Sequence, residues 1–311
     1  MTKDVLLALL PIVLLIGLGM ALRQRHFLEP HFWPQAERLG YYVLLPSLFF
    51  DGLATAHLQS LPVADLALTL ILSTLAVAAL VVLLRPLLHV DGPAFTSVFQ
   101  GSVRFNNYVG VTLAAGLFGA KGIALAAICN AAIVPTVNIL CIMVFARHGA
   151  ARLTGLGILK QLATNPLVVA SLAGILFQWL GLGIPAGIEP ALKTLGAASL
   201  PLGLLCVGAA LDFGNARRWI GPVVSSSLIK FLAMPVATVI AALAIGLKGP
   251  ALTTALIFQA LPTASSAYIL ARQLGGDAPL MAGITATQTV IALVALPAVL
   301  IGVTALMAGS L

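Results

Sequence analysis

The chain has 311 residues, of which 60% are hydrophobic and only 8% are charged. Soluble globular domains carry about 25% charged residues, so this composition excludes a soluble domain and predicts an all-α membrane protein that crosses the bilayer many times. The net charge of +7 is spread over short loops between apolar runs, which favours topology signals over a nucleic-acid partner.

Apolar runs of roughly 20 residues, the length that crosses about 30 Å of hydrocarbon, recur along the whole chain. The first run begins at Val5 and lacks a small-residue cleavage site, so we interpret it as a true span and not as a signal peptide. Polar, glycine and proline boundaries predict about ten spans, at residues 5–22, 35–55, 64–84, 93–118, 122–146, 160–180, 189–211, 220–246, 250–271 and 278–307.

Positive charge accumulates in alternate loops, and cytoplasmic loops are the ones that carry an excess of Lys and Arg. The poorer set of loops holds only Lys3, Lys121, Lys193 and Lys248. The sequence therefore predicts a multi-pass protein of the cell inner (plasma) membrane with both termini outside. The richer, cytoplasmic set holds Arg23, Arg25, Arg38, Arg85, Arg147, Arg152, Lys160, Arg217, Arg218 and Arg272.

The two halves of the chain resemble each other weakly. Gly92-Pro-Ala-Phe-Thr matches Gly249-Pro-Ala-Leu-Thr, and Phe118-Gly-Ala falls on Gly275-Gly-Asp at the same offset. An odd number of spans in each half inverts the second half in the membrane, as in many secondary transporters. We predict a first five-helix repeat over 1–146, a cytoplasmic linker over 147–159 and an inverted repeat over 160–311.

Polar residues interrupt the fourth predicted span about a dozen residues from its start. Arg104, Asn106 and Asn107 lie there, near mid-bilayer at 1.5 Å per residue. An intramembrane Arg costs at least about 2.5 kcal/mol on insertion scales, which favours a partner or a water-filled cavity. The alternative is structural: Arg104 snorkels or ties helices together while the Asn pair joins neighbouring helices.

The ninth predicted span is interrupted by Pro262, which lacks a backbone N–H and should break the helix. Thr263, Ser265 and Ser266 then begin a half-helix whose N-terminus suits a carboxylate. A plain proline kink is the alternative. This break falls in the part of the second half that corresponds to the Arg104 stretch of the first half, which favours a shared substrate site.

These residues resemble the auxin efflux carrier family, including its bacterial PIN-like members. The resemblance covers essentially the whole chain and is carried by Leu44-Leu-Pro-Ser-Leu-Phe-Phe50, by 103–119, by Ala260-Leu-Pro262 and by Tyr268-Ile-Leu-Ala-Arg272. It implies the crossed-helix fold of sodium-coupled bile-acid symporters, with spans one, two, six and seven as a scaffold and the others as a moving transport unit. Asn106, Asn107 and Pro262 then map to the crossing, and a homodimer through the scaffold is implied.

The chain departs from this family in one respect. Many members carry a proline shortly after the Asn-containing break, where this sequence has Thr112, and no proline lies between Pro93 and Pro135. The resemblance therefore leaves open how sharply the fourth span is broken.

Other polar residues inside spans are candidates for lining the crossing or binding a coupling cation. Lys230 is either a second cation for a dianion or a side chain that snorkels to the cytoplasmic end. Asp51 is either a proton relay or a residue of the outer interface. The remaining carboxamides and hydroxyls either line the crossing or join helices: Asn130, Asn138, Thr287 and Gln288.

The sequence carries no pattern typical of an enzyme. The five histidines have no metal-ligand spacing, the three cysteines are unpaired in apolar runs, and no phosphate loop is present. We predict no cofactor and leave H⁺ or Na⁺ open as the coupling ion. The predicted function is a secondary transporter of mono- or dicarboxylates such as malonate, malate or auxin-like acids, working by alternating access. The alternatives are a sodium-coupled symporter of the bile-acid type and a non-transporting sensor or channel.

Overall fold

The computed structural model describes residues 2–56, 61–149, 164–211 and 220–308, and the regular elements in these ranges are helices. Arg152, Lys160, Arg217, Arg218 and most of the predicted linker 147–159 lie outside them. The prediction of an all-helical, multi-pass membrane protein is confirmed, whereas the count of ten spans and the inverted repeat stay predictions. In the described ranges six helical segments are long and apolar enough to cross a membrane: Leu7–Gln24, Val63–Leu88, Gly92–His148, Glu189–Ala209, Ile220–Ile245 and Ala278–Gly302.

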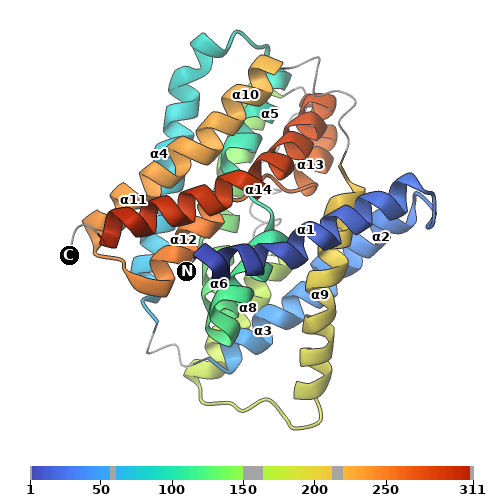
Figure 1. The fold of residues 1–311 in the computed structure, drawn as a ribbon, viewed down its shortest axis with the longest axis vertical. Coiled ribbons are helices and arrows are strands. Elements are labelled where there is room, and N and C mark those ends of the chain that lie inside the picture. The colour runs from blue at the N-terminus through green and yellow to red at the C-terminus, as the bar shows by residue number, and fades with distance from the viewer. Residues whose placement is uncertain (1, 57–60, 150–163, 212–219, 309–311) are drawn as a thin grey trace.

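One set of helices, here called the scaffold group, packs together in the lower part of Figure 1. Its helices α1 and α9 approach so closely that a Cβ atom on Gly19 would lie 2.0 Å from the Leu205 carbonyl oxygen, and one on Gly208 1.9 Å from that of Ile16. Small residues allow such contact between membrane helices. The group comprises α1 (Thr2–Gln24), α2 (Phe32–Leu39), η1 (Gly40–Leu44), α3 (Leu45–Ala54), α8 (Pro166–Trp179) and α9 (Glu189–Ala209).

The remaining helices form a second set, here called the crossing group, which contains the two broken helical segments. Its helix α6 contacts both groups and is therefore the main link between them. The group comprises α4 (Val63–Leu88), α5 (Gly92–Val103), α6 (Asn107–His148), α10 (Ile220–Leu228), η4 (Ile229–Ala233), α11 (Met234–Ile245), α12 (Gly249–Gln259), α13 (Ser266–Leu274) and α14 (Ala278–Ala308).

Helix α6 reverses direction at Gly119, whose φ of 57° and ψ of −137° are open to glycine and strained for other residues. The two arms pack tightly, since a Cβ atom on Gly122 would lie 1.9 Å from the Ala114 carbonyl oxygen. Without this turn the 57 residues of Gly92–His148 would reach about 86 Å, far more than the bilayer core. The segment therefore contains more than one crossing.

Two wide π-helical turns, η1 and η4, each lie just before a proline, Pro46 and Pro235. A proline ring clashes with the carbonyl four residues earlier, and a widened turn accommodates it without ending the helix. Residues Phe32–Ala54 thus continue as one helical segment through η1. Such turns often lie at functional sites, and these two carry Tyr41 and Lys230.

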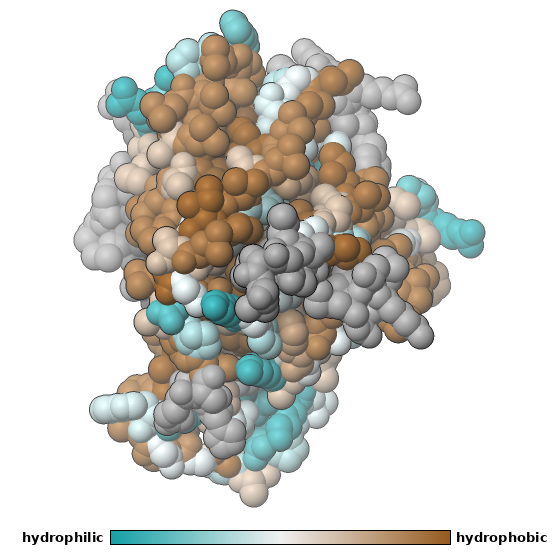
Figure 2. Space-filling view, turned by 60° about the vertical axis from the view of Figure 1, so that its left-hand side comes forward, coloured by the Kyte–Doolittle hydropathy of each residue, from teal (hydrophilic) through white to brown (hydrophobic). Residues whose placement is uncertain are grey.

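The outer surface is apolar over much of the face in Figure 2. Large apolar side chains are left exposed, among them Leu83 at 76% and Val294 at 74%. A soluble monomer rarely presents such a surface, whereas a lipid bilayer covers it.

Candidate functional site

Two helices of the crossing group are interrupted in their middle. Helix α5 ends at Val103 and α6 begins at Asn107, so 104–106 are non-helical. Helix α12 ends at Gln259 and α13 begins at Ser266, so 260–265 form the second interruption. We call these the first and the second break. The fourth predicted span is thus fully broken, although no proline lies at the break.

An asparagine cap holds the first break open. Arg104 is extended, with φ −75° and ψ 161°, and Asn106 has φ −94° and ψ 106°. The Asn106 Oδ1 atom accepts hydrogen bonds from the backbone N–H groups of Tyr108 at 3.1 Å and Val109 at 3.4 Å. This is the usual way to satisfy the free amides of a new helix. Asn106 is 2% exposed and committed to this role.

The side chain of Gln288, on α14, ties the two breaks together. Its Nε2 donates to the Gly101 carbonyl oxygen at 2.9 Å and its Oε1 accepts from the Thr263 N–H at 3.0 Å. The Thr263 hydroxyl donates to the same Gly101 oxygen at 3.1 Å. Backbone groups freed by both breaks therefore find partners inside the membrane, where an unpaired one is costly.

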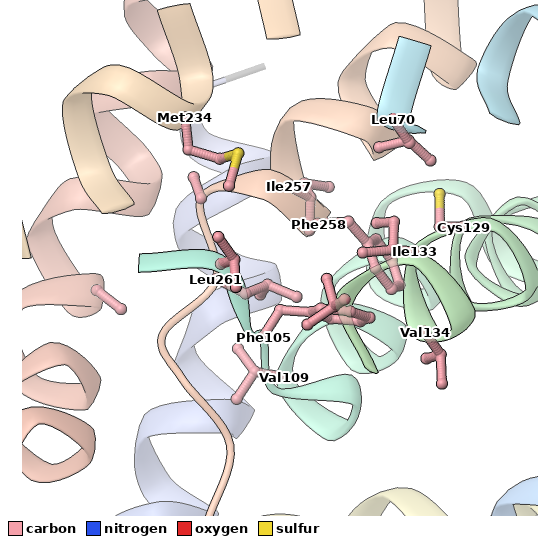
Figure 3. Close-up of a cluster of buried hydrophobic side chains, with 14 of the residues drawn as sticks. Leu70, Phe105, Val109, Cys129, Ile133, Val134, Met234, Ile257, Phe258 and Leu261 are labelled. Carbon is pink, nitrogen blue, oxygen red and sulfur yellow. The ribbon is translucent and has the colours of Figure 1, made fainter. Parts of the chain in front are cut away.

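Apolar side chains close the crossing on one side, as Figure 3 shows for Phe105, Val109, Phe258 and Leu261. The rings of Phe105, in the first break, and Phe258 lie 5.7 Å apart between centroids. A Cβ atom on Gly110 would lie 2.5 Å from Leu261 Cδ1, so glycine permits this close approach.

A small cavity of about 40 Å³ lies between the breaks. The half-buried Arg104 lines it, and its Nη1 donates to Asn138 Oδ1 at 3.2 Å. Asn107 also lines it, and its Oδ1 has no hydrogen-bond partner among the described residues. This oxygen can accept from a hydroxyl or a water, and the Asn107 Nδ2 group is the one that can donate to a carboxylate. The full lining is Tyr41, Arg104, Phe105, Asn107, Val134, Val137, Asn138, Ala264 and Ser266.

The structure therefore brings together Arg104, Asn107, Asn138 and Ser266, of the residues singled out in the sequence. Pro262 lies buried within the second break, and Ser265 precedes α13. Asn106, Thr263 and Gln288 hold the backbone of the breaks and lie outside the cavity lining.

Lys230 is fully buried and lies outside the cavity lining. Its Nζ has no hydrogen-bond partner among the described residues. The snorkelling interpretation does not fit this position, because none of the side chain reaches the surface. The Lys230 side chain therefore does not contribute to the cavity at Arg104.

The other candidates lie apart from the cavity. Asn130 donates to the Ala126 carbonyl oxygen at 2.9 Å within its own helix, and Thr287 is half-buried on α14. Asp51 lines a larger cavity of about 450 Å³ together with Lys121 and Lys193. Lys121 and Lys193 come from the lysine-bearing set of loops, so we call this end of the molecule the lysine end.

Two residues near the breaks carry polar groups that the sequence analysis did not select. Tyr41, in η1, lines the cavity and its hydroxyl accepts from Asn165 Nδ2 at 3.1 Å. Glu37, in α2, accepts a hydrogen bond from the Ser265 hydroxyl. The sequence pattern that could have indicated these two residues is an acidic residue four positions before a tyrosine, at the start of an apolar run.

The described residues contain no group of three His, Cys, Asp or Glu side chains that could hold a metal ion. Cys129, Cys141 and Cys206 are buried and unbridged. The cavity instead offers a guanidinium, a carboxamide and a helix N-terminus, a donor set that suits a carboxylate.

Comparison with known proteins gives one family model, described as membrane transport protein, which matches residues 150–300. A protein of Rhizobium meliloti named "Putative malonate transporter" is 26% identical over 254 residues, 75% of each chain. An "Uncharacterized transporter" of Methanothermobacter thermautotrophicus is 24% identical over 294 residues, 93% of this chain and 95% of its own. "Probable auxin efflux carrier component 5c" of Oryza sativa subsp. japonica is 29% identical over 122 residues, 36% of this chain and 32% of its own.

Proposed function

We propose that this chain, whose residues 150–300 match the membrane transport protein family, is a secondary transporter of small organic anions that works by alternating access. The matched family is one of transporters and not of enzymes. The substrates are mono- or dicarboxylates. A similar protein is named for malonate, which supports this class.

The observation that carries the proposal is the placement of Arg104 between two broken helices, in a cavity. A guanidinium has five N–H donors in a planar fork that fits a carboxylate, and one bond to Asn138 leaves others for a ligand. The neighbouring Asn107 and the start of α13 at Ser266 supply further donors and partial positive charge.

The size of the cavity favours small substrates. Its volume of about 40 Å³ is well below the ≈ 300–1,000 Å³ of typical ligand pockets. A cavity needs about 10–15 Å³ of such volume to hold one water, so this one has room for a few waters or a small carboxylate. Malonate or malate therefore suits the site better than an indole acid or a bile acid.

The two helix groups supply the parts for alternating access. Backbone contact between α1 and α9 makes the scaffold group a rigid partner, against which the crossing group can move. Helices α5 and α12 both begin with Gly-Pro and end in a break, which supports the inverted repeat. We further propose cytoplasmic placement of the arginine-bearing loops, external termini and a homodimer through the scaffold group.

The test is counterflow of labelled malonate in liposomes that contain the purified protein. Arg104→Gln should lower the transport rate about tenfold or more, because a charge-assisted hydrogen bond contributes about 1.5–3 kcal/mol. Arg104→Lys should restore it only in part, since an ammonium lacks the planar fork. Arg147→Gln, an exposed arginine at the end of α6, is the matched control.

Saturable counterflow supports a carrier, whereas flux far above carrier turnover indicates a channel. Transport that disappears without Na⁺ identifies the symporter alternative, and transport that follows a pH gradient identifies H⁺ as the coupling ion. If folded Arg104→Gln protein carries malonate at the wild-type rate, the site assignment is wrong.

A further inference from the structure

Two contacts join the crossing group to the scaffold group beside the cavity. The first is made by Tyr108, in the first turn of α6 directly after the Asn106 cap. A Cβ atom on Gly203 of α9 would lie 2.0 Å from Tyr108 Cδ1, and one on Gly40 of η1 would lie 2.7 Å from the Tyr108 hydroxyl. The Tyr108 side chain thus occupies a notch that exists only because both scaffold positions are glycine. We call it the tyrosine notch.

The second contact is the hydrogen bond from the Ser265 hydroxyl to Glu37 Oε1. Ser265 ends the second break and directly precedes α13, whereas Glu37 belongs to α2 of the scaffold group. Within five residues, Glu37 therefore contacts the second break, Gly40 contacts Tyr108 just after the first break, and Tyr41 lines the cavity. One short stretch of the scaffold group holds both breaks at once.

At the lysine end a cavity separates part of the two groups. The cavity of about 450 Å³ lies between α3 and α9 of the scaffold group and the α6 turn of the crossing group. Ile123 and Gly52 approach each other in its wall, from α6 and α3. The described conformation therefore joins the two groups at Glu37 and leaves a cavity between them at the lysine end.

We propose that the tyrosine notch and the Glu37–Ser265 hydrogen bond form a lock that positions the crossing group in the described conformation, in which the cavity at the lysine end is present. The inference rests on the proposed alternating access. Tyr108 and Glu37 are positioning residues in it, because neither lines the cavity at Arg104.

The chemistry of the lock makes it reversible. The Tyr108 hydroxyl is buried and has no hydrogen-bond partner among the described residues. A buried polar group without a partner loses its hydration, so the closed lock carries a cost that opening removes.

The test is the labelling rate of a cysteine placed in the cavity wall, Ile123→Cys, with a maleimide on purified detergent-solubilised protein. The native cysteines are buried, which keeps the background low. Gly203→Ala displaces the Tyr108 ring, and Ser265→Ala removes the hydroxyl that binds Glu37. Each should lower the labelling rate about threefold or more, as the population moves away from the open cavity.

Tyr108→Phe keeps the ring and removes the unpaired hydroxyl, so it should leave labelling unchanged or faster. Gly183→Ala is the control, because no atom lies within 4 Å of its Cβ position. Ser265→Ala removes one hydroxyl and keeps the readout available if Gly203→Ala does not fold. Equal labelling in Ser265→Ala and wild type overturns the lock.

The labelling readout does not require transport. If wild-type protein shows no counterflow but the lock variants change labelling, the proposed substrate fails and the lock stands. If malonate is transported and labelling does not respond, the lock alone is wrong.

Discussion

Asn106 and Asn107 are adjacent in sequence but differ in what their side-chain oxygens do. The Asn106 oxygen accepts two backbone hydrogen bonds and caps α6, whereas the Asn107 oxygen has no partner among the described residues and lies at the cavity. The first residue therefore builds the break, and the second is available to a ligand.

This division predicts separate effects on stability and transport. Asn106→Ala should lower the free energy of unfolding by about 1 kcal/mol through loss of the cap, and Asn106→Ser should retain most of it. Asn107→Ala should leave the melting temperature near wild type but weaken malonate counterflow. Thermal unfolding and counterflow on the three variants give the comparison. Equal melting of Asn106→Ala and Asn106→Ser would contradict the capping role.

Sequence reasoning found Arg104 and Asn107 because polar groups in an apolar run are costly and therefore informative. It did not select Tyr41 or Glu37. Tyr41 and Glu37 contribute because their helical segments lie against the cavity and the second break. That arrangement depends on contacts between residues more than 100 positions apart. The sequence analysis placed Asn106 at the ligand because a carboxamide can hydrogen-bond a carboxylate. In the structure its extended φ and ψ angles and its two cap hydrogen bonds place its oxygen on the start of α6.

At the scale of the helices, the two breaks have different causes. Pro262 made the second break predictable, since proline lacks the N–H that a helix needs. The first break has no proline, and the sequence did not decide whether the helix is interrupted there. Its stability comes from the Asn106 cap and from donors on α14 and in the second break, so the tertiary structure overrides the helical tendency of the segment.

Gln288 should therefore matter to the helices that it joins. Gln288→Leu leaves the Gly101 oxygen with one donor fewer and the Thr263 N–H without its acceptor, which should cost about 1–3 kcal/mol. Thr287→Val, on the adjacent position of α14, is the matched control. Melting temperatures of the two variants in the same detergent provide the measurement, and a Gln288→Leu protein as stable as Thr287→Val would refute the tie between the breaks.

At the scale of the whole molecule, composition together with the recurring apolar runs of about 20 residues predicted the helical membrane protein, because a run of that length is what a helix needs to cross the hydrocarbon with its backbone hydrogen-bonded. The number of crossings was harder to confirm. Helix α8 has only 14 residues, and the Phe32–Ala54 segment carries the charged residues Glu37, Arg38 and Asp51, so neither is among the six segments that are long and apolar enough to cross a membrane. Their place in the scaffold group comes from packing against α3 and α9, which periodicity does not reveal.

The scaffold group predicts a sharp dependence on one glycine. Gly208→Val places a side chain where the Ile16 carbonyl oxygen lies 1.9 Å from the Cβ position, which should separate α1 from α9 and lower the yield of folded protein severalfold. Gly302, which has no atom within 4 Å of its Cβ position, gives the control Gly302→Val. The monodisperse peak in size-exclusion chromatography reports the outcome, and an unchanged peak for Gly208→Val would argue against a rigid scaffold.

The bond from Gln288 to Gly101 also sets an order of events during biosynthesis. The two residues are 187 positions apart, so at roughly 5–20 residues per second the donor leaves the ribosome about 10–40 s after its acceptor. Until then the Gly101 carbonyl is best satisfied within a continuous helix, by the amide of Phe105. The nascent chain should therefore enter the bilayer with this segment unbroken, and the anion site should mature only when the final helix arrives.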